Sequence, residues 1–496
     1  MAKYSDGHYD GPNGMHGVPT WRVAGFSLNN SATNCYLFMT WYVSYFLSGF
    51  AGAGVILAGS FAMISRIWDG VTDPFVGLIV DRTNGKFGKN RPFMVIGNVV
   101  MFASTFLMYR VTPLLPDGVR LIWFFVMNAI FYLGYTCQCI ITKAGQSCLT
   151  NDPKQRPIFG VVDGICTPVV FALGEMLVSM VLVPKYGKME ALGVFQDMSL
   201  ILGIASAILT VIAFISIAPK DNSRYFGTGK EQKVGFKDYV DVLLHNRGIQ
   251  MLVASASTDK LGMNAKTTTV TLILFGIIAG NYALSGIVAG YTTIVTVAFI
   301  LFGVGFIARE MGQKRALVVG SIGCVITNVL MMALWWFGDP TTLSLPGDGA
   351  FTRFSFFTIA FVTLYLIAQG MQNISSAVVI TMTADCTDYE TYRSGRYVPG
   401  MIGTLFSFVD KMVSSVAPMI ASLMLATIGF KDSMPDIGTP LTPQLKFVGL
   451  FLAFGILAIM NGVNLIAMHF YPLDKKKMEE IQDEIAAIKA KAAAAG

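Results

Sequence analysis

Long apolar runs separated by short polar segments repeat along almost the whole chain. A membrane-spanning helix needs about 20 mostly apolar residues. Runs of this length predict twelve spans, at residues 22–50, 54–80, 93–112, 119–149, 158–183, 197–218, 249–279, 283–308, 316–337, 352–383, 398–429 and 446–471. The first, seventh and eleventh spans carry many Ser, Thr, Asn or charged residues, as expected for a helix with one face exposed to water. The pattern therefore predicts an all-α protein that crosses a membrane repeatedly.

The longest polar stretch between spans, residues 219–248, divides the spans into six and six. A weak internal repeat supports two related halves, since "GLIVDRTNGKFGKNRPFMVIG" follows the second span and "GFIAREMGQKRALVVG" follows the eighth. Two six-helix bundles around a central cavity form the major-facilitator architecture, with the substrate site between the halves. We expect a cytoplasmic tail, a first bundle, a cytoplasmic linker, a second bundle and a second cytoplasmic tail at 1–21, 22–218, 219–248, 249–472 and 473–496.

Charged residues make up only 13% of the chain, whereas a soluble protein has about a quarter. The net charge of +6 does not indicate a nucleic-acid surface, because Lys and Arg gather in alternate loops and in the C-terminal tail. The opposite loops "SGFAGAG" and "GDPTTLSLPGDG" contain neither. The positive-inside rule then places both termini in the cytoplasm. The polar N-terminus shows no secretory signal peptide, and we expect a multi-pass protein of the cell (inner) membrane.

Two aspartates interrupt the second span in "SRIWDGVTDP". Asp69 and Asp73 are four residues apart, so they share one helix face, with Thr72 beside them. An ionisable group at the centre of a span costs about 2.5–3.5 kcal/mol. Two close carboxylates also repel, unless a proton or a bound cation joins them. A coupling cation, either Na⁺ or H⁺, is therefore favoured, and ion pairing with Lys411 or Arg66 is the structural alternative.

Polar groups also interrupt the fourth and fifth spans. Lys143 allows three interpretations: it binds a substrate anion, pairs with the aspartates of the second span, or reaches the inner surface. Two turns earlier, Thr136 offers a hydroxyl at a suitable depth for the cation. Glu175 is the only acid in "FALGEMLVSM". It is either functional or a protonated or singly hydrogen-bonded glutamate.

The seventh span contains "STDKLGMNAKT", with the polar residues Asp259, Lys260, Asn264 and Lys266. So polar a stretch favours the wall of a water-filled cavity. The alternative is a broken helix whose charges pair with one another. The eleventh span adds Asp410 and Lys411, and Lys411 is a fixed positive charge in the half opposite the paired aspartates.

The sequence shows no nucleophile elbow, Walker loop, selectivity-filter repeat or His–Cys metal cluster. The four histidines lie in tails, loops or a span end, and the seven cysteines lack metal-ligand spacing. We therefore expect no enzyme activity, no catalytic residue, no cofactor, and no metal beyond the coupling cation.

Several segments resemble the glycoside–pentoside–hexuronide:cation symporters, the melibiose permease group of the major facilitator superfamily. "RIWDGVTDP" matches that family's cation motif in the second span almost letter for letter. "ADCTDYETYRSG" (384–395), followed by Lys411, resembles its 10–11 loop signature, and "YT" (135–136) and "LTNDPKQR" (149–156) lie at the family's spacing. The resemblance covers all twelve spans, and it implies cation-coupled transport of a sugar.

The resemblance implies roles at the matching positions. Asp69 and Asp73 bind the coupling cation, and Thr136 matches a hydroxyl of the family's cation site. Thr72 falls where the melibiose permease has an asparagine, and Lys411 matches a lysine near both the cation and the sugar. The charges that hold the cytoplasmic side shut in the outward-facing state match Asp81, Arg82, Arg156, Asp385 and Asp388.

The positions that read the sugar depart from the family pattern. The melibiose permease uses an aspartate in span one, and an aspartate and a tryptophan in span four, where this chain has Ala32, Cys139 and Lys143. Asp163 replaces the family's span-five arginine, and Lys260 and Asn264 replace asparagines. Amide side chains bind hydroxyls in both senses. We therefore expect substrate contacts from Asn30, Asn34, Tyr135, Cys139, Lys143, Lys260, Asn264 and Lys411.

Lys143 and Lys260, one from each half, together suit a carboxylate or sulfonate, which favours an acidic sugar such as a hexuronide over a neutral one. We predict a cation-coupled symporter that imports a glycoside or sugar by alternating access. Its partners are the sugar, the cation and the lipid bilayer, with no nucleic acid, and we expect a monomer. The alternatives are a carrier of an amphiphile such as a lysolipid, and a non-coupled facilitator or sensor with the same fold.

Overall fold

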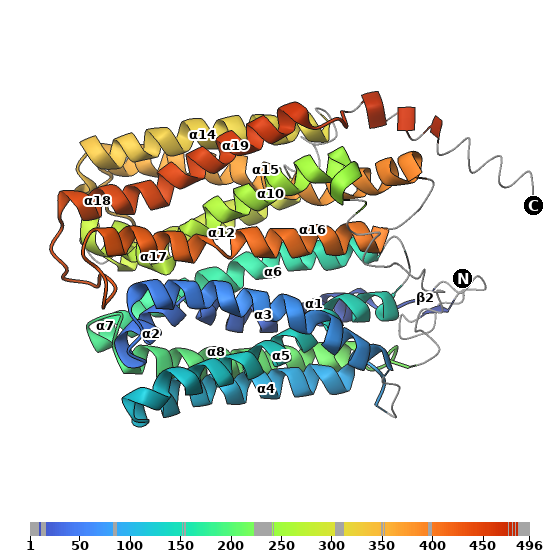
Figure 1. Ribbon diagram of the computed structural model, residues 1–496, viewed down its shortest axis with the longest axis horizontal. Helices are drawn as coiled ribbons and strands as arrows, with labels where there is room; N and C mark the ends of the chain where they lie inside the picture. The colour runs from blue at the N-terminus through green and yellow to red at the C-terminus, as the bar shows by residue number, and fades with distance from the viewer. Residues whose placement is uncertain are drawn as a thin grey trace, which may run out of the picture. The chain divides into compact units, whose positions relative to one another are not determined.

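The computed structural model describes residues 9–10, 16–82, 87–150, 152, 155–222, 241, 243–302, 312–348, 351, 353–394, 399–474, 476–478, 480–481 and 483–484. These residues are largely helical, as Figure 1 shows. A short antiparallel pair joins β1 (Tyr9–Asp10) to β2 (His16–Gly17). The all-α architecture predicted from the apolar runs is confirmed.

Two compact units make up the protein. Unit 1 comprises Met1–Lys230, Phe275–Val297 and Ser422–Pro440, and unit 2 comprises Glu231–Leu274, Ala298–Ala421 and Leu441–Gly496. Unit 1 therefore includes two segments from the second half of the chain. One contains most of α12 (Ala283–Phe302), and the other contains the end of α17 (Ala417–Thr427) and the loop after it. Contacts between these segments and the N-terminal helices are contacts within unit 1.

Each predicted span contains a helix or a run of helices. The N-terminal helices of unit 1 are α1 (Thr20–Thr40), α2 (Val43–Phe50), α3 (Val55–Arg82), α4 (Arg91–Val111), η1 (Thr112–Leu114), α5 (Asp117–Leu149), α6 (Arg156–Met176), the π-helical η2 (Leu177–Leu182), α7 (Val183–Tyr186) and α8 (Leu192–Ile217). Unit 2 contains α10 (Arg247–Ala265), α11 (Thr268–Thr271), α14 (Gln313–Phe337), η4 (Pro340–Thr342), α15 (Phe356–Ser394), α16 (Pro399–Ser414), α18 (Pro443–Leu450), the π-helical η5 (Phe451–Gly455) and α19 (Ile456–Phe470). The π-helical η3 (Leu272–Ile278) follows α11 across the boundary between the units.

Within the described residues, nine helices are long and apolar enough to cross a membrane. The number becomes ten if α10 and its continuation, which meet at a 50° bend, count as one span. The described part of α12 adds a shorter apolar helix, Ala283–Ala298. α1 has 21 residues but buries polar side chains such as Asn29 and Asn34. The prediction of twelve spans is consistent with these helices, and the polar first and bent seventh spans are those with the least lipid-like sequences.

The N-terminal helices of unit 1 pack in pairs. α1 packs on α6 and α8, α4 packs on α5 and α8, and α3 packs on α5. α4 and α5 approach each other at two glycines, since a Cβ added to Gly97 would lie 2.9 Å from the carbonyl oxygen of Gly134. Small residues at a contact let two spans approach closely. The core between these helices includes Phe26, Val76, Met94, Ile141 and Ile217.

Unit 2 has a core of its own. α10 packs on α16 and α19, and α14 packs on α15 and α19. The buried apolar side chains of this core include Ile249, Leu252, Leu317, Val378 and Met382. One side of α10 is therefore fixed against the core. Further along α10, beyond this core, Lys260, Met263 and Asn264 are exposed.

The residues after α8 anchor the loop that leads into α4. The buried carboxylate of Asp221 accepts hydrogen bonds from the backbone N–H groups of Lys89 (3.1 Å), Asn90 (3.1 Å) and Arg91 (2.9 Å). Gly88 has φ +85°, and a Cβ there would lie 2.3 Å from Asp221. The loop therefore depends both on the carboxylate and on the absence of a side chain at position 88.

We expect Gly88→Ala to destabilise the protein by about 2–4 kcal/mol, because the left-handed backbone and the clash with Asp221 both oppose a side chain. The melting temperature of the purified protein in detergent measures the effect. Gly187→Ala is the matched control, since Gly187 has φ +81° but nothing within 4 Å of an added Cβ. Equal losses in the two variants would contradict the role given to Asp221.

Candidate functional site

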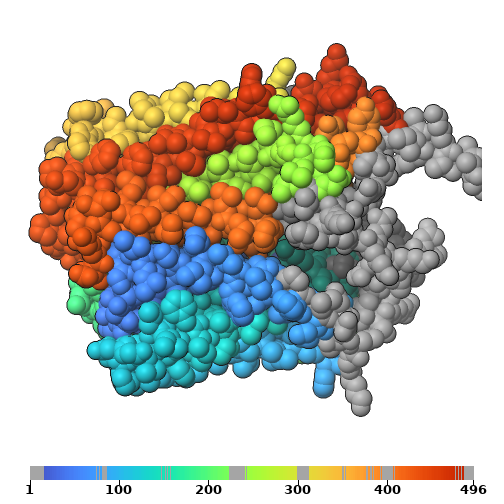
Figure 2. Space-filling model, viewed as in Figure 1, coloured from blue at the N-terminus to red at the C-terminus, as the bar shows by residue number. Residues whose placement is uncertain are grey.

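α3 has two different faces. An apolar stripe follows its exposed face at helical spacing, as expected for a lipid-facing surface: Ile64, Ile67, Val71, Phe75 and Ile79. The other face is buried and carries Ser65, Asp69, Thr72, Val76 and Val80. Figure 2 shows one side of α3, in blue, on the surface of unit 1. The carboxylate of the first motif aspartate therefore points into the bundle and away from the exposed stripe.

The buried face of α3 meets α5 in a cluster of oxygen atoms. Thr136 Oγ1 lies 3.4 Å from Asp69 Oδ1 and 3.1 Å from Thr72 Oγ1. Thr72 Oγ1 also donates to the backbone carbonyl oxygen of Asp69 at 3.0 Å. Asp69 and Thr136 are 0% exposed, and Thr72 is 4% exposed. The structure thus brings together three of the four residues that the sequence assigns to the cation.

Asp73 and Arg66 flank this cluster along α3. Asp73 lies one turn further on and is half-buried. Arg66 lies one turn earlier, and its Nη1 is 3.7 Å from Asp69 Oδ2. Arg66 therefore forms the ion pair with Asp69 that the sequence offered as the alternative. Its distance of 3.7 Å is longer than the roughly 2.7–2.9 Å of a charge-assisted hydrogen bond. The contact of Arg66 with Asp69 is therefore longer than a tight salt bridge.

Two polar pairs join α1 to α6. Asn30 Nδ2 donates to Asp163 Oδ1 at 2.7 Å, and Asn34 Nδ2 donates to Thr167 Oγ1 at 3.0 Å. Because the members are four residues apart on each helix, the pairs form two rungs one turn apart. Both asparagines were expected to contact substrate, and each of them holds a side chain of α6. Asp163 was known from the sequence only as the residue that replaces an arginine.

Tyr135, Cys139 and Lys143 follow one another at four-residue spacing on α5, so they share one face. Tyr135 and Cys139 are half-buried, and Lys143 is exposed. The ring of Tyr135 stacks on that of Phe131, with the centroids 6.2 Å apart. A lysine exposed to lipid inside a span is costly. The exposure of Lys143 therefore indicates either a wet side of this helix or a position near the inner surface.

A short ion pair joins α10 to α16 in unit 2. Lys260 Nζ lies 2.5 Å from Asp410 Oδ2. One turn further along α10, Asn264 Nδ2 donates to the backbone carbonyl oxygen of Ser414 at 3.4 Å. Lys411, which follows on α16, is half-buried. Lys260 is therefore not an isolated cation: a charge of the seventh span does find a partner, and the partner comes from the eleventh span.

A buried carboxylate lies next to this ion pair. Asp259 is 5% exposed, and its Oδ1 and Oδ2 lie 2.9 and 2.8 Å from Nε2 of Gln372 on α15. At the bend after α10, Lys266 Nζ lies 3.4 Å from the hydroxyl of Tyr365 and 4.9 Å from the centroid of its ring. Gln372 was not among the expected site residues, because an uncharged amide in an apolar run carries no strong signal.

Glu175, near the end of α6, accepts hydrogen bonds from three hydroxyl groups. Tyr42 donates to Oε2 at 2.8 Å, Ser285 donates to Oε1 at 2.8 Å, and Tyr282 donates to Oε1 at 3.4 Å. Tyr42 lies between α1 and α2, and the other two donors lie at the start of α12. We call these four residues the hydroxyl cluster. Glu175 is therefore not a singly hydrogen-bonded glutamate, because three hydroxyl groups donate to its carboxyl group.

The segment after α17 also docks on N-terminal residues of unit 1. The carboxylate of Asp436 accepts hydrogen bonds from the backbone N–H groups of Met189 (3.0 Å) and Glu190 (3.1 Å). The hydroxyl of Tyr45 donates to the carbonyl oxygen of Pro435 at 3.0 Å. Together with the hydroxyl cluster, these contacts join the ends of the first and fifth spans to two segments from the second half of the chain.

The residues predicted for the cytoplasmic gate are only partly described. Arg156 begins α6 and is exposed, and Asp385 and Asp388 are half-buried on α15. The side chains of Asp81 and Arg82, at the end of α3, lie outside the described residues. Arg156 belongs to unit 1, whereas Asp385 and Asp388 belong to unit 2. The predicted gate stays a prediction.

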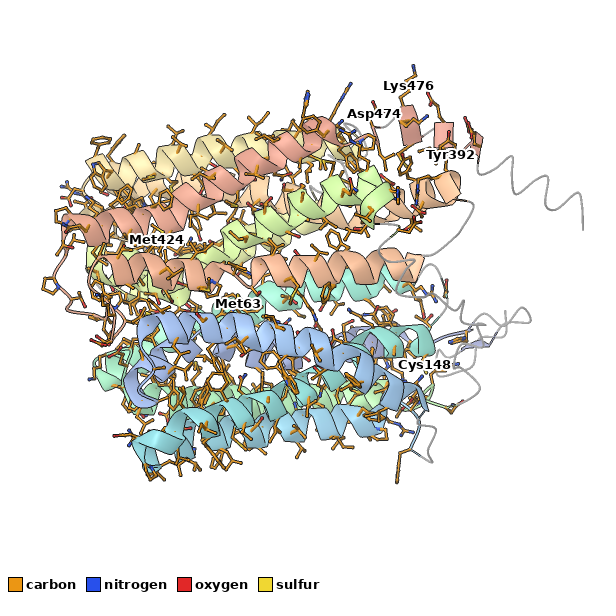
Figure 3. The ribbon with its side chains drawn as sticks, in the orientation of Figure 1. Met63, Cys148, Tyr392, Met424, Asp474 and Lys476 are labelled. Carbon is orange, nitrogen blue, oxygen red and sulfur yellow. The ribbon has the colours of Figure 1, made fainter. Side chains whose placement is uncertain are left out.

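A charge cluster near the end of α15 was missed by the sequence analysis. Glu390 accepts hydrogen bonds from Arg393 Nη2 at 2.9 Å and from Asn246 Nδ2 at 2.8 Å. Arg393 Nη2 also lies 3.6 Å from Asp241 Oδ2. Asn246 in turn caps α10 by accepting a hydrogen bond from the N–H group of Ile249 at 3.0 Å. Figure 3 labels Tyr392 in the same stretch of α15.

Asp385 lies beyond the membrane-crossing part of α15, Phe356–Ser375. Burial, with a smaller effect from the nearby Asp388, raises the pKa of Asp385 from 3.8 to about 6. The folded state thus binds this proton more tightly than the unfolded state between these values. The contribution of this carboxyl group to stability is therefore complete below pH 3.8 and is lost as the pH rises through about 6.

We expect Asp385→Asn to remove the loss of stability that accompanies ionisation of Asp385. Between about pH 4 and pH 7 the wild-type melting temperature should fall relative to that of the variant, because only the wild type must ionise a buried carboxyl group. Thermal unfolding in detergent across the pH range measures the difference. Asp117→Asn, at a side chain that is 92% exposed, is the control. Parallel pH profiles for wild type and Asp385→Asn would contradict the prediction.

Comparison with known proteins identifies the family. The family profile described as MFS/sugar transport protein matches residues 28–475. The chain is 24% identical over 474 residues to a glucuronide carrier protein homolog of Escherichia coli (strain K12), covering 94% of this chain and 95% of that protein. It is 20% identical over 479 residues to an isoprimeverose transporter of Lactiplantibacillus pentosus, covering 94% and 91%.

The fold is also that of a solved transporter. The crystal structure of the nucleoside transporter NupG matches with a TM-score of 0.59 at 14% identity, covering 91% of this chain and 100% of that chain. At this identity the likeness concerns the fold alone. The predicted major-facilitator fold is confirmed, and so is the prediction of a transporter and not an enzyme. The chain belongs to the MFS/sugar transport protein family of multi-pass membrane transporters.

Proposed function

We propose that the protein is a cation-coupled symporter that imports a glycoside or another sugar by alternating access. The observation that carries this proposal is the buried oxygen cluster of Asp69, Thr72 and Thr136 in a chain of this family. A carboxylate inside a transporter bundle is costly unless it has a function or a partner. The relatives support the proposal, since one is named a glucuronide carrier protein homolog and another an isoprimeverose transporter.

The oxygen cluster suits either Na⁺ or a proton as the coupling ion. Carboxylate and hydroxyl oxygens are the ligands that hard cations prefer, and a carboxyl group can equally carry a proton. Asp73, one turn along the helix, supplies a second carboxylate. A bound cation reduces the repulsion between the two and holds α3 against α5, which prepares the transporter for substrate. By linkage, the substrate then raises cation affinity by the same factor.

Exposed polar side chains within the spans support a polar substrate. Lys260 and Asn264 on α10 are exposed deep within the seventh span. Inside a membrane, such side chains face water and not lipid. A carrier of a lysolipid needs a largely apolar route for the acyl chain. The exposed charges therefore favour a sugar over an amphiphile.

The contacts of the hydroxyl cluster and of Asp436 support a state that is closed towards the outside. With a cytoplasmic N-terminus, the ends of odd-numbered spans and the loops after them lie at the outer face of the inner membrane. Tyr42, Glu175 and Asp436 all belong to such regions. We propose that these contacts form an outer closure, which breaks when the site opens outward. We further propose that both termini lie in the cytoplasm and that the transporter works as a monomer.

Uptake into proteoliposomes tests the proposal. The purified protein is reconstituted, an inward Na⁺ or H⁺ gradient is imposed, and radiolabelled neutral glycosides, acidic glycosides and a lysolipid are offered. We expect one gradient to drive accumulation of a glycoside above its external concentration. Equal entry with and without a gradient would indicate an uncoupled facilitator. Transport of the lysolipid alone would overturn the sugar assignment.

A further inference from the structure

We infer that the ion pair of Lys260 and Asp410 binds hydroxyl groups of a neutral sugar, and that Asp410 excludes acidic substrates. This inference rests on the proposed function, since it names the substrate class of the same transporter. It replaces the preference for an acidic sugar that follows from treating Lys143 and Lys260 as two available cations. In the structure, Lys260 is paired with Asp410.

The ion pair lies where two spans meet and faces solvent on one side. α10 and α16 pack against each other. The side chain of Lys260 is 52% exposed, whereas that of Asp410 is 9% exposed. At 1.5 Å per residue, Lys260 is about 20 Å along the helix axis from Arg247, deep within the seventh span. A half-exposed lysine side chain at this depth needs water beside it, so the pair faces the route of a polar substrate.

An acidic substrate can use Lys260 only by displacing Asp410. Displacement leaves a buried carboxylate without its partner, which is strongly unfavourable. Asp259, which immediately precedes Lys260 on α10, adds a second buried carboxylate. The formal charges of Lys260, Asp410 and Asp259 sum to −1 when all three side chains are ionised. The site therefore offers no net positive charge to a carboxylate.

A sugar hydroxyl leaves the ion pair intact. It is both a donor and an acceptor, so it can accept from Lys260 Nζ and donate to the carboxylate of Asp410 at the same time. Asn264, exposed one turn further along α10, offers an amide that also works in both senses. Neighbouring hydroxyls of a neutral glycoside match this set. The pair of Asn30 and Asp163 in unit 1 has the same chemistry, a carboxylate with a polar N–H donor and no excess positive charge.

Asp410→Asn tests the inference, because it keeps the shape of the side chain and releases the ammonium group of Lys260. The substrates are the neutral glycoside that the wild type accumulates most and the uronide with the same ring. Their uptake rates are compared in proteoliposomes under the same cation gradient. We expect the wild type to favour the neutral compound, and Asp410→Asn to shift the ratio of rates towards the uronide by about tenfold or more. The double variant Lys260→Gln with Asp410→Asn should lose that shift.

The outcomes separate this inference from the proposed function. An unchanged ratio in Asp410→Asn, or a wild type that favours the uronide, overturns the inference and leaves symport standing. A wild type that accumulates no glycoside under either gradient overturns the proposed function itself. If Asp410→Asn does not fold, the exchanged pair Lys260→Asp with Asp410→Lys replaces it. A retained preference for the neutral glycoside then supports the inference, and a preference for the uronide overturns it.

Discussion

Replacing Asp69 with Cys is expected to abolish gradient-driven accumulation of the sugar while the protein still reaches the membrane. The carboxylate is fully buried and shares its surroundings with the hydroxyls of Thr72 and Thr136. A thiol supplies no comparable charge for a cation. Loss of about 3 kcal/mol of cation binding lowers coupled uptake by about 100-fold or more. Asp73→Cys is expected to act in the same direction, because the second carboxylate lies on the same face.

Uptake in proteoliposomes under Na⁺ or H⁺ gradients measures the effect, and substrate binding without a gradient separates coupling from folding. Asp69→Cys should still bind the sugar, but the cation should no longer raise its affinity. Asp117→Cys, an exposed acid at the start of α5, is the matched control and should transport normally. Thr136→Val removes one neutral ligand and should cost about tenfold in cation affinity. Undiminished accumulation in Asp69→Cys would rule out the cation site.

The arrangement of α3 could be predicted from the sequence because it depends on helical period alone. Residues spaced by three and four share a face, so the apolar stripe through Val71 and the polar stripe through Asp69 separate without any knowledge of the neighbours. The position of α5 is different. That Thr136 lies against Asp69 follows from the packing of α3 on α5, and the sequence suggested it only through depth and the family resemblance.

The partners of charged residues could not be predicted from the sequence in the same way. Lys260 and Asp410 are 150 residues apart, and Asp436 lies 247 residues from Met189. Such pairs depend on which helices pack together and on rotamers at their contact, and neither leaves a periodic signal. The consequence was largest at Lys260. Lys143 and Lys260 in the sequence favour an acidic sugar, whereas in the structure Asp410 neutralises the charge of Lys260.

Glu175→Leu is expected to shift the carrier towards its outward-open state. The change removes the acceptor that holds Tyr42, Tyr282 and Ser285 together and leaves their hydroxyls buried without it. Hydrogen bonds to a charged group contribute about 1.5–3 kcal/mol each. Losing the two short hydrogen bonds, from Tyr42 and Ser285, changes the ratio of closed to open carriers by more than about 100-fold.

Labelling of Asn281→Cys with a membrane-impermeant maleimide, in a background without the native cysteines, measures this shift from outside. Asn281 immediately precedes Tyr282, so a reagent should reach it faster once the closure opens. Glu175→Gln keeps one acceptor oxygen and should produce a smaller increase in labelling rate. The same rate in wild type and Glu175→Leu would contradict the role of the hydroxyl cluster in the closure.

The melting temperature of each variant must be measured alongside the labelling rate. If Glu175 only stabilised the fold, its loss would also expose Asn281, but through local unfolding. Local unfolding lowers the melting temperature and raises labelling in proportion, whereas a released closure raises labelling in a protein that stays folded. Asp436→Asn weakens the same closure through separate contacts with Met189 and Glu190. If both act on one open–closed equilibrium, their free-energy shifts should add to within about 0.5 kcal/mol in the double variant. Transport should slow in each variant without losing cation dependence, since the closure has to form once in every cycle but does not hold the cation.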